Sequence, residues 1–240
     1  MKTSVLVVMV VTAVFLVSVA LFVSRGGRFS ASYAAPREAS AAPQSSGQSL
    51  TYDFDNDNAG AIPAKFHGAR TGQGSEGKWV VMTDTTAPSK PNVVAQTSTD
   101  KTDYRFPLLI SDEGSFKDLD LSVKFKAVTG EVDRAAGLVF RLKDANNYYI
   151  VRANALEDNY RLYHVIKGSR RRFAGANFKV TSGEWHELRV ECVGNKIICY
   201  YDGAKKIEAT DDTFQDAGKV GLWTKADSVT YFDDLKAIAK

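Results

Sequence analysis

Gly218-Lys219-Val220-Gly221-Leu222-Trp223, followed closely by Val229-Thr230-Tyr231-Phe232-Asp233-Asp234-Leu235, ends the chain with two apolar runs. Aromatic and β-branched residues of this kind fit a pleated, half-buried surface. The polar Ala226-Asp227-Ser228 segment interrupts the pattern, as the turn of a hairpin does. We therefore expect two antiparallel strands that close a β-sandwich at the C-terminal end of the chain.

Residues 119–128 give the clearest strand signal upstream of this pair. Apolar side chains from Leu119 to Ala127 alternate with polar ones, and a period of two over this length is typical of a strand with one buried face. Other short apolar runs follow one another with turns between them, which predicts a sandwich or a barrel. Further strands are expected at 79–82, 92–97, 105–110, 136–142, 147–154, 160–166, 171–178, 185–193, 196–202 and 205–209, with a short helical turn only within 210–217.

The composition favours an all-β globular domain. The chain of 240 residues contains ten Tyr and thirteen Phe, which favour strands over a helical bundle. Its formal net charge is +3, so it is less basic than a typical nucleic-acid protein, and no nucleic-acid partner is expected. We predict an all-β, two-sheet antiparallel jelly-roll sandwich over residues 50–240.

The N-terminal segment is expected to serve export and not the fold. Residues 1–34 contain an apolar run from Ser4 to Val23, close to the length of about 20 residues that spans a membrane. Small residues at Ser32 and Ala34 suit a signal peptidase, so a cleaved signal peptide and a retained anchor both remain open. Residues 35–49 are predicted to be a flexible linker. The domain would then be periplasmic, cell-surface or extracellular, touching a membrane only through the anchor.

The two cysteines, Cys192 and Cys199, flank a Gly194-Asn195 hairpin turn signal. With that turn Cys192 pairs with Ile197, and the two sulfurs lie diagonally on one face, which suits disulfide geometry poorly. A register shifted by one residue would place them opposite each other. We favour two buried thiols and keep the disulfide as the alternative.

Several sequence motifs lack the neighbouring elements or partner residues that their chemistry requires. Gly72-Gln73-Gly74-Ser75-Glu76-Gly77 fits a dinucleotide-binding pattern but lacks the buried strand before it and the helix after it. Only three histidines are present, which disfavours a catalytic zinc site or a Ser-His-Asp triad. The basic run Lys167-Gly168-Ser169-Arg170-Arg171-Arg172 is interpreted as the solvated tip of a hairpin, since such runs keep sheet edges soluble. A site for acidic polysaccharide, phospholipid headgroups or nucleic acid is the alternative.

Alternation along the strands predicts one polar and aromatic surface. If Tyr149, Val151 and Ala153 face the core, their neighbours face outward. Rings can stack on apolar sugar faces, while guanidinium and amide groups bond hydroxyls or carboxylates. An alternating strand must also show polar groups to water, so an ordinary solvated face is the alternative, and Trp223 equally suits the core. The candidate ligand-binding residues are Arg141, Tyr148, Arg152, Asn154, Arg161, Tyr163 and Trp223.

A family resemblance follows from the order and spacing of several motifs. The chain resembles concanavalin A-like, LamG-type jelly rolls, and among them the exported bacterial 3-keto-disaccharide hydrolase family. The resemblance covers residues from about Leu50 to Lys240 and implies two curved sheets with a concave glycan-facing surface. Its members include binding modules and glycoside hydrolases. The motifs are Ala136-Gly137-Leu138-Val139-Phe140-Arg141, Asn146-Asn147-Tyr148-Tyr149-Ile150-Val151-Arg152, Gly183-Glu184-Trp185-His186-Glu187-Leu188-Arg189-Val190, Tyr201-Asp202-Gly203 and the two C-terminal runs.

The resemblance also implies a structural calcium ion where the first and last strands meet. Carboxylates that converge there would repel one another unless a hard cation neutralised them, and Ca²⁺ takes about 6–8 oxygen ligands. Solvated turn acids are the alternative, and the first segment departs from an EF-hand because Asn58 replaces the invariant Gly. The candidate calcium ligands are Asp53, Asp55, Asp57, Asp233 and Asp234.

The acids that would cleave a glycosidic bond are not evident. Related glucanases carry a Glu-x-Asp-x-x-Glu strand, which is absent here, and the outward positions after the Phe140-Arg141 element are Ile150, Arg152 and Asn154. We therefore predict an exported glycan-binding domain without catalysis. A glycoside hydrolase of the 3-keto-disaccharide type, and a structural or protein-binding envelope domain, remain the alternatives.

Overall fold

The computed structural model describes residues 47–240, and every regular element in this part of the chain is a β-strand. No helix in this part is long and apolar enough to cross a membrane. The predicted signal or anchor (1–34) and most of the predicted linker lie outside the described residues. The strands are β1 (Ser49–Tyr52), β2 (Phe66–Gly72), β3 (Trp79–Thr83), β4 (Asn92–Gln96), β5 (Arg105–Ser111), β6 (Leu119–Thr129), β7 (Ala135–Asp144), β8 (Asn147–Asn154), β9 (Asn159–Ile166), β10 (Ser169–Asn177), β11 (His186–Val193), β12 (Lys196–Tyr201), β13 (Ala204–Thr210), β14 (Lys219–Trp223) and β15 (Val229–Ala239).

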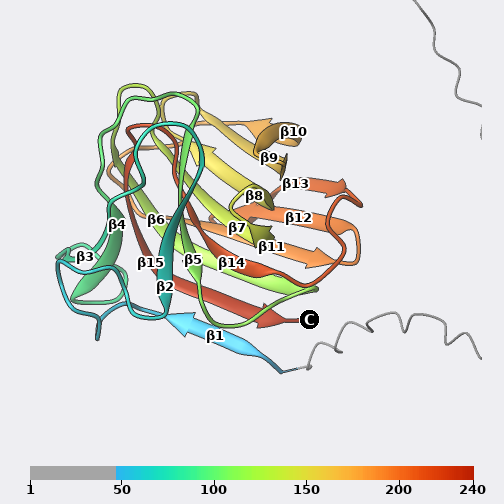
Figure 1. The fold of residues 1–240 in the computed structure, drawn as a ribbon, viewed down its shortest axis with the longest axis horizontal. Helices are drawn as coiled ribbons and strands as arrows, with labels where there is room; N and C mark the ends of the chain where they lie inside the picture. The colour runs from blue at the N-terminus through green and yellow to red at the C-terminus, as the bar shows by residue number, and fades with distance from the viewer. Residues whose placement is uncertain (1–46) are drawn as a thin grey trace, which may run out of the picture. The chain divides into compact units, whose positions relative to one another are not determined.

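The strands form two antiparallel sheets that pack as a sandwich (Figure 1). The eight-stranded sheet has the order β13-β12-β11-β6-β15-β4-β3, with β1 paired to β15. The seven-stranded sheet has the order β10-β9-β8-β7-β14-β5-β2. The C-terminal runs do not pair with each other: β14 lies between β7 and β5, whereas β15 lies between β6 and β4 of the other sheet. The all-β two-sheet prediction is confirmed, and the expected terminal hairpin is wrong.

The main core lies between the two sheets. Alternate residues of β6 from Leu119 to Ala127 are buried there, as the period of two predicts. From the facing sheet, Leu138, Phe140 and Tyr149 enter the same cluster. Burial of each such side chain contributes about 1.5–3 kcal/mol, so this layer accounts for most of the apolar stabilisation.

The hairpin β11–β12 has the register that its turn sequence predicts. Cys192 pairs with Ile197, and Val190 pairs with Cys199. Both cysteines are free and buried. Burial raises the pKa of the Cys192 thiol to about 11 and that of Cys199 still further. The prediction of two buried thiols is therefore confirmed, and neither is a reactive thiolate at neutral pH.

Two strands were not expected from the sequence. Only Phe66 and Thr71 of β2 are buried, and no residue of β1 is fully buried, so neither strand shows an apolar alternation. Each lies at the margin of its sheet and is held mainly by backbone pairing, β1 to β15 and β2 to β5. The short helical turn expected within residues 210–217 is absent from this described segment.

Candidate functional site

The seven-stranded sheet carries a second apolar and aromatic cluster on the face turned away from the other sheet. All buried members of this cluster come from β5, β7, β8, β9 and β14 of that one sheet. Trp223 is fully buried in it and stacks on Phe106, with ring centroids 5.3 Å apart. We call this surface the outer face; its buried apolar members are Phe106, Leu108, Ile110, Ala135, Val139, Leu142, Tyr148, Ile150, Tyr163, Val165 and Trp223.

Strand register places a row of functional side chains across this face. Trp223 of β14 pairs with Gly137 of β7, Gly137 pairs with Arg152 of β8, and Arg152 pairs with Arg161 of β9. A Cβ on Gly137 would come within 2.5 Å of Ile150 Cδ1 and 3.2 Å of the Trp223 ring. Glycine at this position therefore leaves the space that the Trp223 ring and the Ile150 side chain occupy.

Arg152 is the central polar group of the row. Its side chain is 5% exposed, and its Nη2 donates to Glu157 Oε2 at 2.8 Å and to the Tyr163 hydroxyl at 3.2 Å. Its Nε and Nη1 atoms are buried and have no hydrogen-bond partner within residues 47–240. Burial alone would lower the pKa of Arg152, but Tyr163 and the nearby carboxylates outweigh it and raise the pKa. Arg152 is thus a fixed cation with unused donors.

Arg170 crosses the aromatic cluster from β10. Its guanidinium carbon lies 4.5 Å from the Tyr163 ring centroid, 4.6 Å from that of Phe106 and 5.5 Å from that of Trp223. The Tyr104 hydroxyl donates to Gly168 O at 2.9 Å and accepts from Arg170 N at 3.2 Å, so the hairpin tip is tied to the sheet. Arg170 therefore does not belong to a solvated tip, which corrects the interpretation of the basic run for this residue.

Two carboxylates with opposite pKa shifts lie beside Arg152. Asp133 is 1% exposed, accepts from Asn154 Nδ2 at 2.9 Å and lies 2.9 Å from Lys225 Nζ. Burial raises the pKa of Asp133 despite the cations around it. Burial would also raise the pKa of Glu157, but the hydrogen bonds from Arg152 and Asn159 lower it to about 2.

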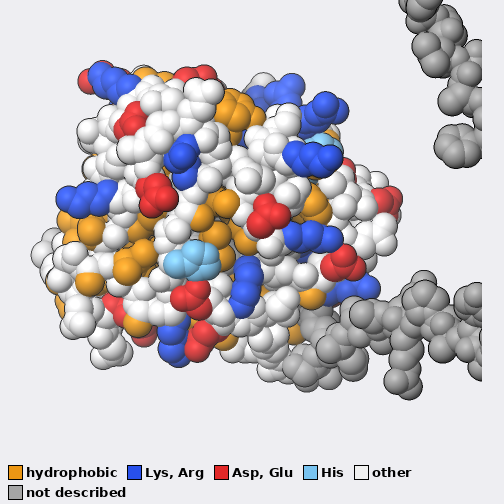
Figure 2. All heavy atoms as spheres, in the orientation of Figure 1, with side chains coloured by type: hydrophobic (Ala, Val, Ile, Leu, Met, Phe, Trp, Pro, Cys, Tyr) orange, Lys and Arg blue, Asp and Glu red, His pale blue; other side chains and the backbone are white. Residues whose placement is uncertain are grey.

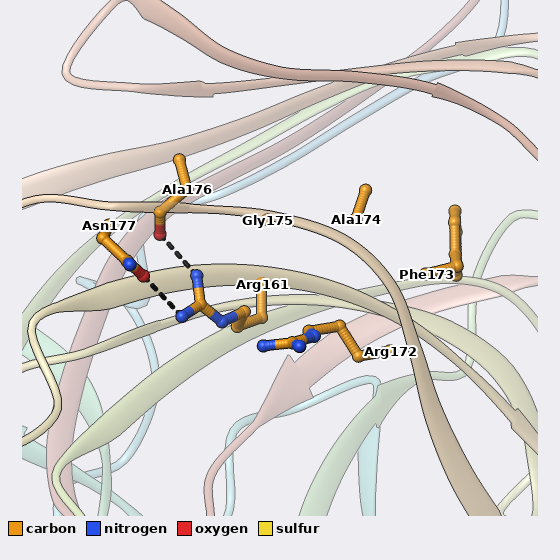
Figure 3. A pocket seen from close by; sticks show the side chains of 7 residues that line it. All are labelled: Arg161, Arg172, Phe173, Ala174, Gly175, Ala176 and Asn177. Atoms are coloured by element: carbon orange, nitrogen blue, oxygen red, sulfur yellow. Dashed lines mark hydrogen bonds between the residues drawn. The ribbon is translucent and has the colours of Figure 1, made fainter.

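An open groove of about 460 Å³ continues the outer face along β9 and β10. In Figure 3 the side chains of Arg161 and Arg172 extend on the same side of the two strands, and both line the groove. Arg161 Nη1 donates to Ala176 O at 2.6 Å, and its Nη2 donates to Asn177 Oδ1 at 2.5 Å. Figure 2 shows basic side chains gathered over the same end of the molecule, at the upper right where β9 and β10 lie.

The predicted site residues divide into two groups. Arg152, Asn154, Arg161, Tyr163 and Trp223 all lie on the outer face within neighbouring strands. Tyr148 lies on that face too but is fully buried, and its hydroxyl is 2.8 Å from Thr71 Oγ1.

Arg141 lies apart from the others. It has a positive φ of 47° at a bulge of β7, and this bulge breaks the alternation that predicted an outward side chain. Its side chain is 1% exposed and donates to Lys117 O (2.7 Å), Phe214 O (2.8 Å) and Gly194 O (2.7 Å). Arg141 therefore joins three loops through their backbone carbonyls.

The predicted calcium ligands are only partly brought together. Burial raises the pKa of Asp234; Lys124 opposes this shift, and the charges of Asp53 and Asp55 add to it. Asp57 turns away, and its Oδ1 accepts from Ala64 N at 2.9 Å. Among residues 47–240 no three His, Cys, Asp or Glu side chains are grouped as a metal centre.

Asp233 makes the stability of the fold depend on pH. It is fully buried, and its two oxygens accept from Ser89 N at 2.9 Å and Ser89 Oγ at 2.8 Å. Burial raises its pKa to about 6, so folding favours its protonated form. The stability that protonated Asp233 contributes is full below about pH 4 and is lost as the pH rises through about 6.

Asp233→Asn should therefore change the pH dependence of stability. Without divalent ions, the free energy of unfolding of the wild type relative to the variant should fall by on the order of 2 kcal/mol between pH 4 and 7. Urea unfolding of both proteins over this range measures the difference. A difference that is constant with pH would contradict the raised pKa of Asp233.

Sequence reasoning missed Arg170, Asp133 and Lys225 as parts of the outer-face cluster. Arg170 lies in a basic run that any solvated hairpin could contain. Asp133 and Lys225 belong to turns, and their proximity depends on β7 and β14 being neighbours in the sheet. The only usable signal was alternation along β10, which places Arg170 and Arg172 on the same face.

Comparison with known proteins agrees with this architecture. A family model described as the 3-keto-alpha-glucoside-1,2-lyase-like domain matches residues 60–237. A comparison with curated protein sequences gave no match.

Three solved structures illustrate the shared fold. The carbohydrate binding module CBM66 from Bacillus subtilis has 22% identity and a TM-score of 0.56, with 67% of this chain and 91% of that chain covered. Bacillus licheniformis β-glucanase has 13% identity and a TM-score of 0.55, covering 82% and 100%. The exoplasmic/lumenal domain of VIP36, in its Ca²⁺/Man-bound form, has 12% identity and a TM-score of 0.54, covering 79% and 88%. At these identities the likeness shows a shared jelly-roll fold alone. Since the family model spans most of the sequence, the chain belongs to the 3-keto-alpha-glucoside-1,2-lyase-like domain family.

Proposed function

We propose that the protein is an exported glycan-binding domain that holds its ligand on the outer face of the seven-stranded sheet. The unused donors of Arg152 carry this proposal, because its Nε and Nη1 are buried without a partner among the described residues. Leaving a buried donor unpaired costs about 1–3 kcal/mol. A sugar hydroxyl or carboxylate would supply the missing acceptors, and the neighbouring rings would pack on apolar sugar faces.

The opposite face of the sandwich differs in how its charges are paired. It also carries an open groove, of about 440 Å³ and lined by Lys126 and Tyr231, but Lys126 is ion-paired with Asp84. On the eight-stranded sheet Lys124 pairs with Glu187 at 2.9 Å, and Arg189 pairs with Asp120 at 2.7 Å. Lys196 also pairs with a carboxylate, Glu208 Oε1, at 2.7 Å. These solvated ion pairs satisfy one another, which supports the outer face of the seven-stranded sheet as the ligand surface.

A binding experiment tests whether the glycan is held on the outer face or elsewhere on the surface. Arg152→Ala should weaken binding to the oligosaccharides that the wild type retains on a glycan array by about 30-fold or more. Tyr163→Phe, which removes only one hydroxyl, provides a milder variant if Arg152→Ala unfolds. Arg189→Gln, on the opposite face, is the matched control and should bind as the wild type does. Equal binding by wild type and both outer-face variants would overturn the proposal.

A glycoside hydrolase is the second candidate, and one observation favours it. Asp133 and Glu157 are carboxylates with pKa values shifted in opposite directions beside Arg152, as a general acid and a base require. Against this, Asp133 is almost fully buried and ion-paired with Lys225. We therefore favour binding without turnover. Incubation with a 3-keto-α-glucoside decides the matter: sugar release that Asp133→Asn and Glu157→Gln abolish would establish the hydrolase.

We further propose, as the family resemblance suggests, that calcium binds near Asp53, Asp55 and Asp234. The mutual repulsion that helps to raise the pKa of Asp234 supports this location. Addition of Ca²⁺ at neutral pH should raise the melting temperature of the wild type by several degrees and that of Asp234→Asn by less. An equal response of the two proteins to Ca²⁺ and EDTA would contradict this location.

A further inference from the structure

Four arginines lie on one end of the outer face, on three neighbouring strands. They are Arg152 on β8, Arg161 on β9, and Arg170 and Arg172 on β10. Arg152 pairs directly with Arg161 in the register, and like charges directly opposite each other destabilise a sheet. The chain therefore retains two like charges, Arg152 and Arg161, that repel each other across the β8–β9 pair.

Acidic side chains neutralise only part of this charge. Glu157 pairs with Arg152 at 2.8 Å. The acceptors of Arg161 are all neutral, namely two backbone carbonyls and the Asn177 amide. Within residues 47–240 the Arg172 side chain makes no ion pair or hydrogen bond, and Arg170 Nη1 is buried without a partner. Arg161 and Arg172 thus form an uncompensated cationic pair, which contrasts with the self-paired charges of the opposite sheet.

The groove leaves room for an anion at this pair. Gly175 lies opposite Arg161 in the register, and a Cβ there would come 2.7 Å from Arg161 Cδ and 3.0 Å from its Nη1. Glycine at this position lets the Arg161 side chain lie against β10, in the groove that Arg172 also lines (Figure 3). Two adjacent guanidinium groups attract an oxyanion strongly and can bind it in bidentate fashion.

We infer that the glycan bound by this protein is anionic, with a uronate carboxylate or a sulfate ester seated between Arg161 and Arg172. This inference rests on the proposed function and specifies its ligand class. Neutral sugar units next to the anion would then extend along the outer face towards Arg152 and Tyr163. Arg161 and Arg172 determine specificity for charge, whereas Arg152 and Tyr163 bind both neutral and charged glycans.

The test compares matched pairs of polysaccharides that share a backbone and differ in charge. The immobilised probes are polygalacturonate with its methyl ester, and dextran sulfate with dextran, and short single-stranded DNA serves as an unrelated polyanion. The protein variants are Arg172→Gln and its neighbour Arg171→Gln. Both side chains are exposed and both changes remove one charge, but alternation places Arg171 on the opposite face of β10.

We expect the wild type to bind at least one charged probe more tightly than its neutral partner. Arg172→Gln should lose roughly 10- to 100-fold of that affinity, as expected for a charge-assisted hydrogen bond, and Arg171→Gln should lose little. The carboxylate and sulfate pairs distinguish the two oxyanions, and added NaCl should weaken only the charged interaction.

Other outcomes separate the two proposals. Binding of neutral probes alone, with sensitivity to Arg152→Ala, would overturn the anionic specificity and leave glycan binding intact. Equal losses in Arg171→Gln and Arg172→Gln, or equal binding of DNA, would show unspecific charge attraction and likewise overturn it. Failure to bind any polysaccharide would overturn both proposals.

Discussion

Arg141→Ala is expected to lower the free energy of unfolding by about 3–5 kcal/mol, because it removes a buried cation on which three backbone carbonyls and the Asp118 carboxylate converge. The guanidinium donates to the carbonyls of Lys117, Gly194 and Phe214, and the variant would lose these three hydrogen bonds. Urea unfolding measures the effect. Since the side chain is only 1% exposed, glycan binding by the folded fraction should be unchanged.

Arg172→Ala is the matched control for Arg141. Its side chain is exposed, so the free energy of unfolding should change by no more than about 0.5 kcal/mol. Arg141→Lys should fall between the two, because lysine keeps the charge but lacks the planar fork. A loss below about 1 kcal/mol for Arg141→Ala would show that the loops hold together without it.

Trp223→Ala should cost about 3–5 kcal/mol, as expected when a large, fully buried ring is truncated. The change would also remove the support beneath Arg170 and expose Phe106, which stacks on Trp223. Trp185→Ala is the control, since that ring is only half-buried and should cost much less. Equal losses in both variants would contradict a core role for Trp223.

Trp223→Phe separates packing from ligand contact. Phenylalanine keeps most of the buried ring but removes Nε1, a buried donor that lies near the Tyr148 hydroxyl. If Nε1 contacts the glycan, the variant stays folded and binds more weakly. Unchanged binding would assign Trp223 to packing alone. This pair of variants decides between the two roles that the sequence left open.

Alternation was sufficient to assign most strands and their buried faces. Tyr149, Val151 and Ala153 enter the inter-sheet core, and Arg152 and Asn154 face outward, as predicted. The rule failed at Arg141, where a bulge with positive φ turns the side chain into the loops. This bulge depends on the pairing of β7 with both β8 and β14. That pairing cannot be deduced from the sequence of β7 alone.

The candidate site was predicted only in part. Arg152, Arg161 and Tyr163 share a face because consecutive hairpins fix their register, and this much is local information. The approach of Arg170 to the Trp223 ring requires β10 and β14 to curve towards each other across the sheet. The pairing of Asp133 with Lys225 likewise joins turns about ninety residues apart.

Short-range periodicity and turn chemistry were enough to predict the all-β class, the register of the β11–β12 hairpin and the facing of most strand residues, Arg141 excepted. Two features could not be predicted: β14 and β15 belong to different sheets, and Arg170 covers an aromatic cluster. Both depend on long-range strand pairing. It sets which strands are neighbours, and hence which charges are buried without a partner and left to a ligand.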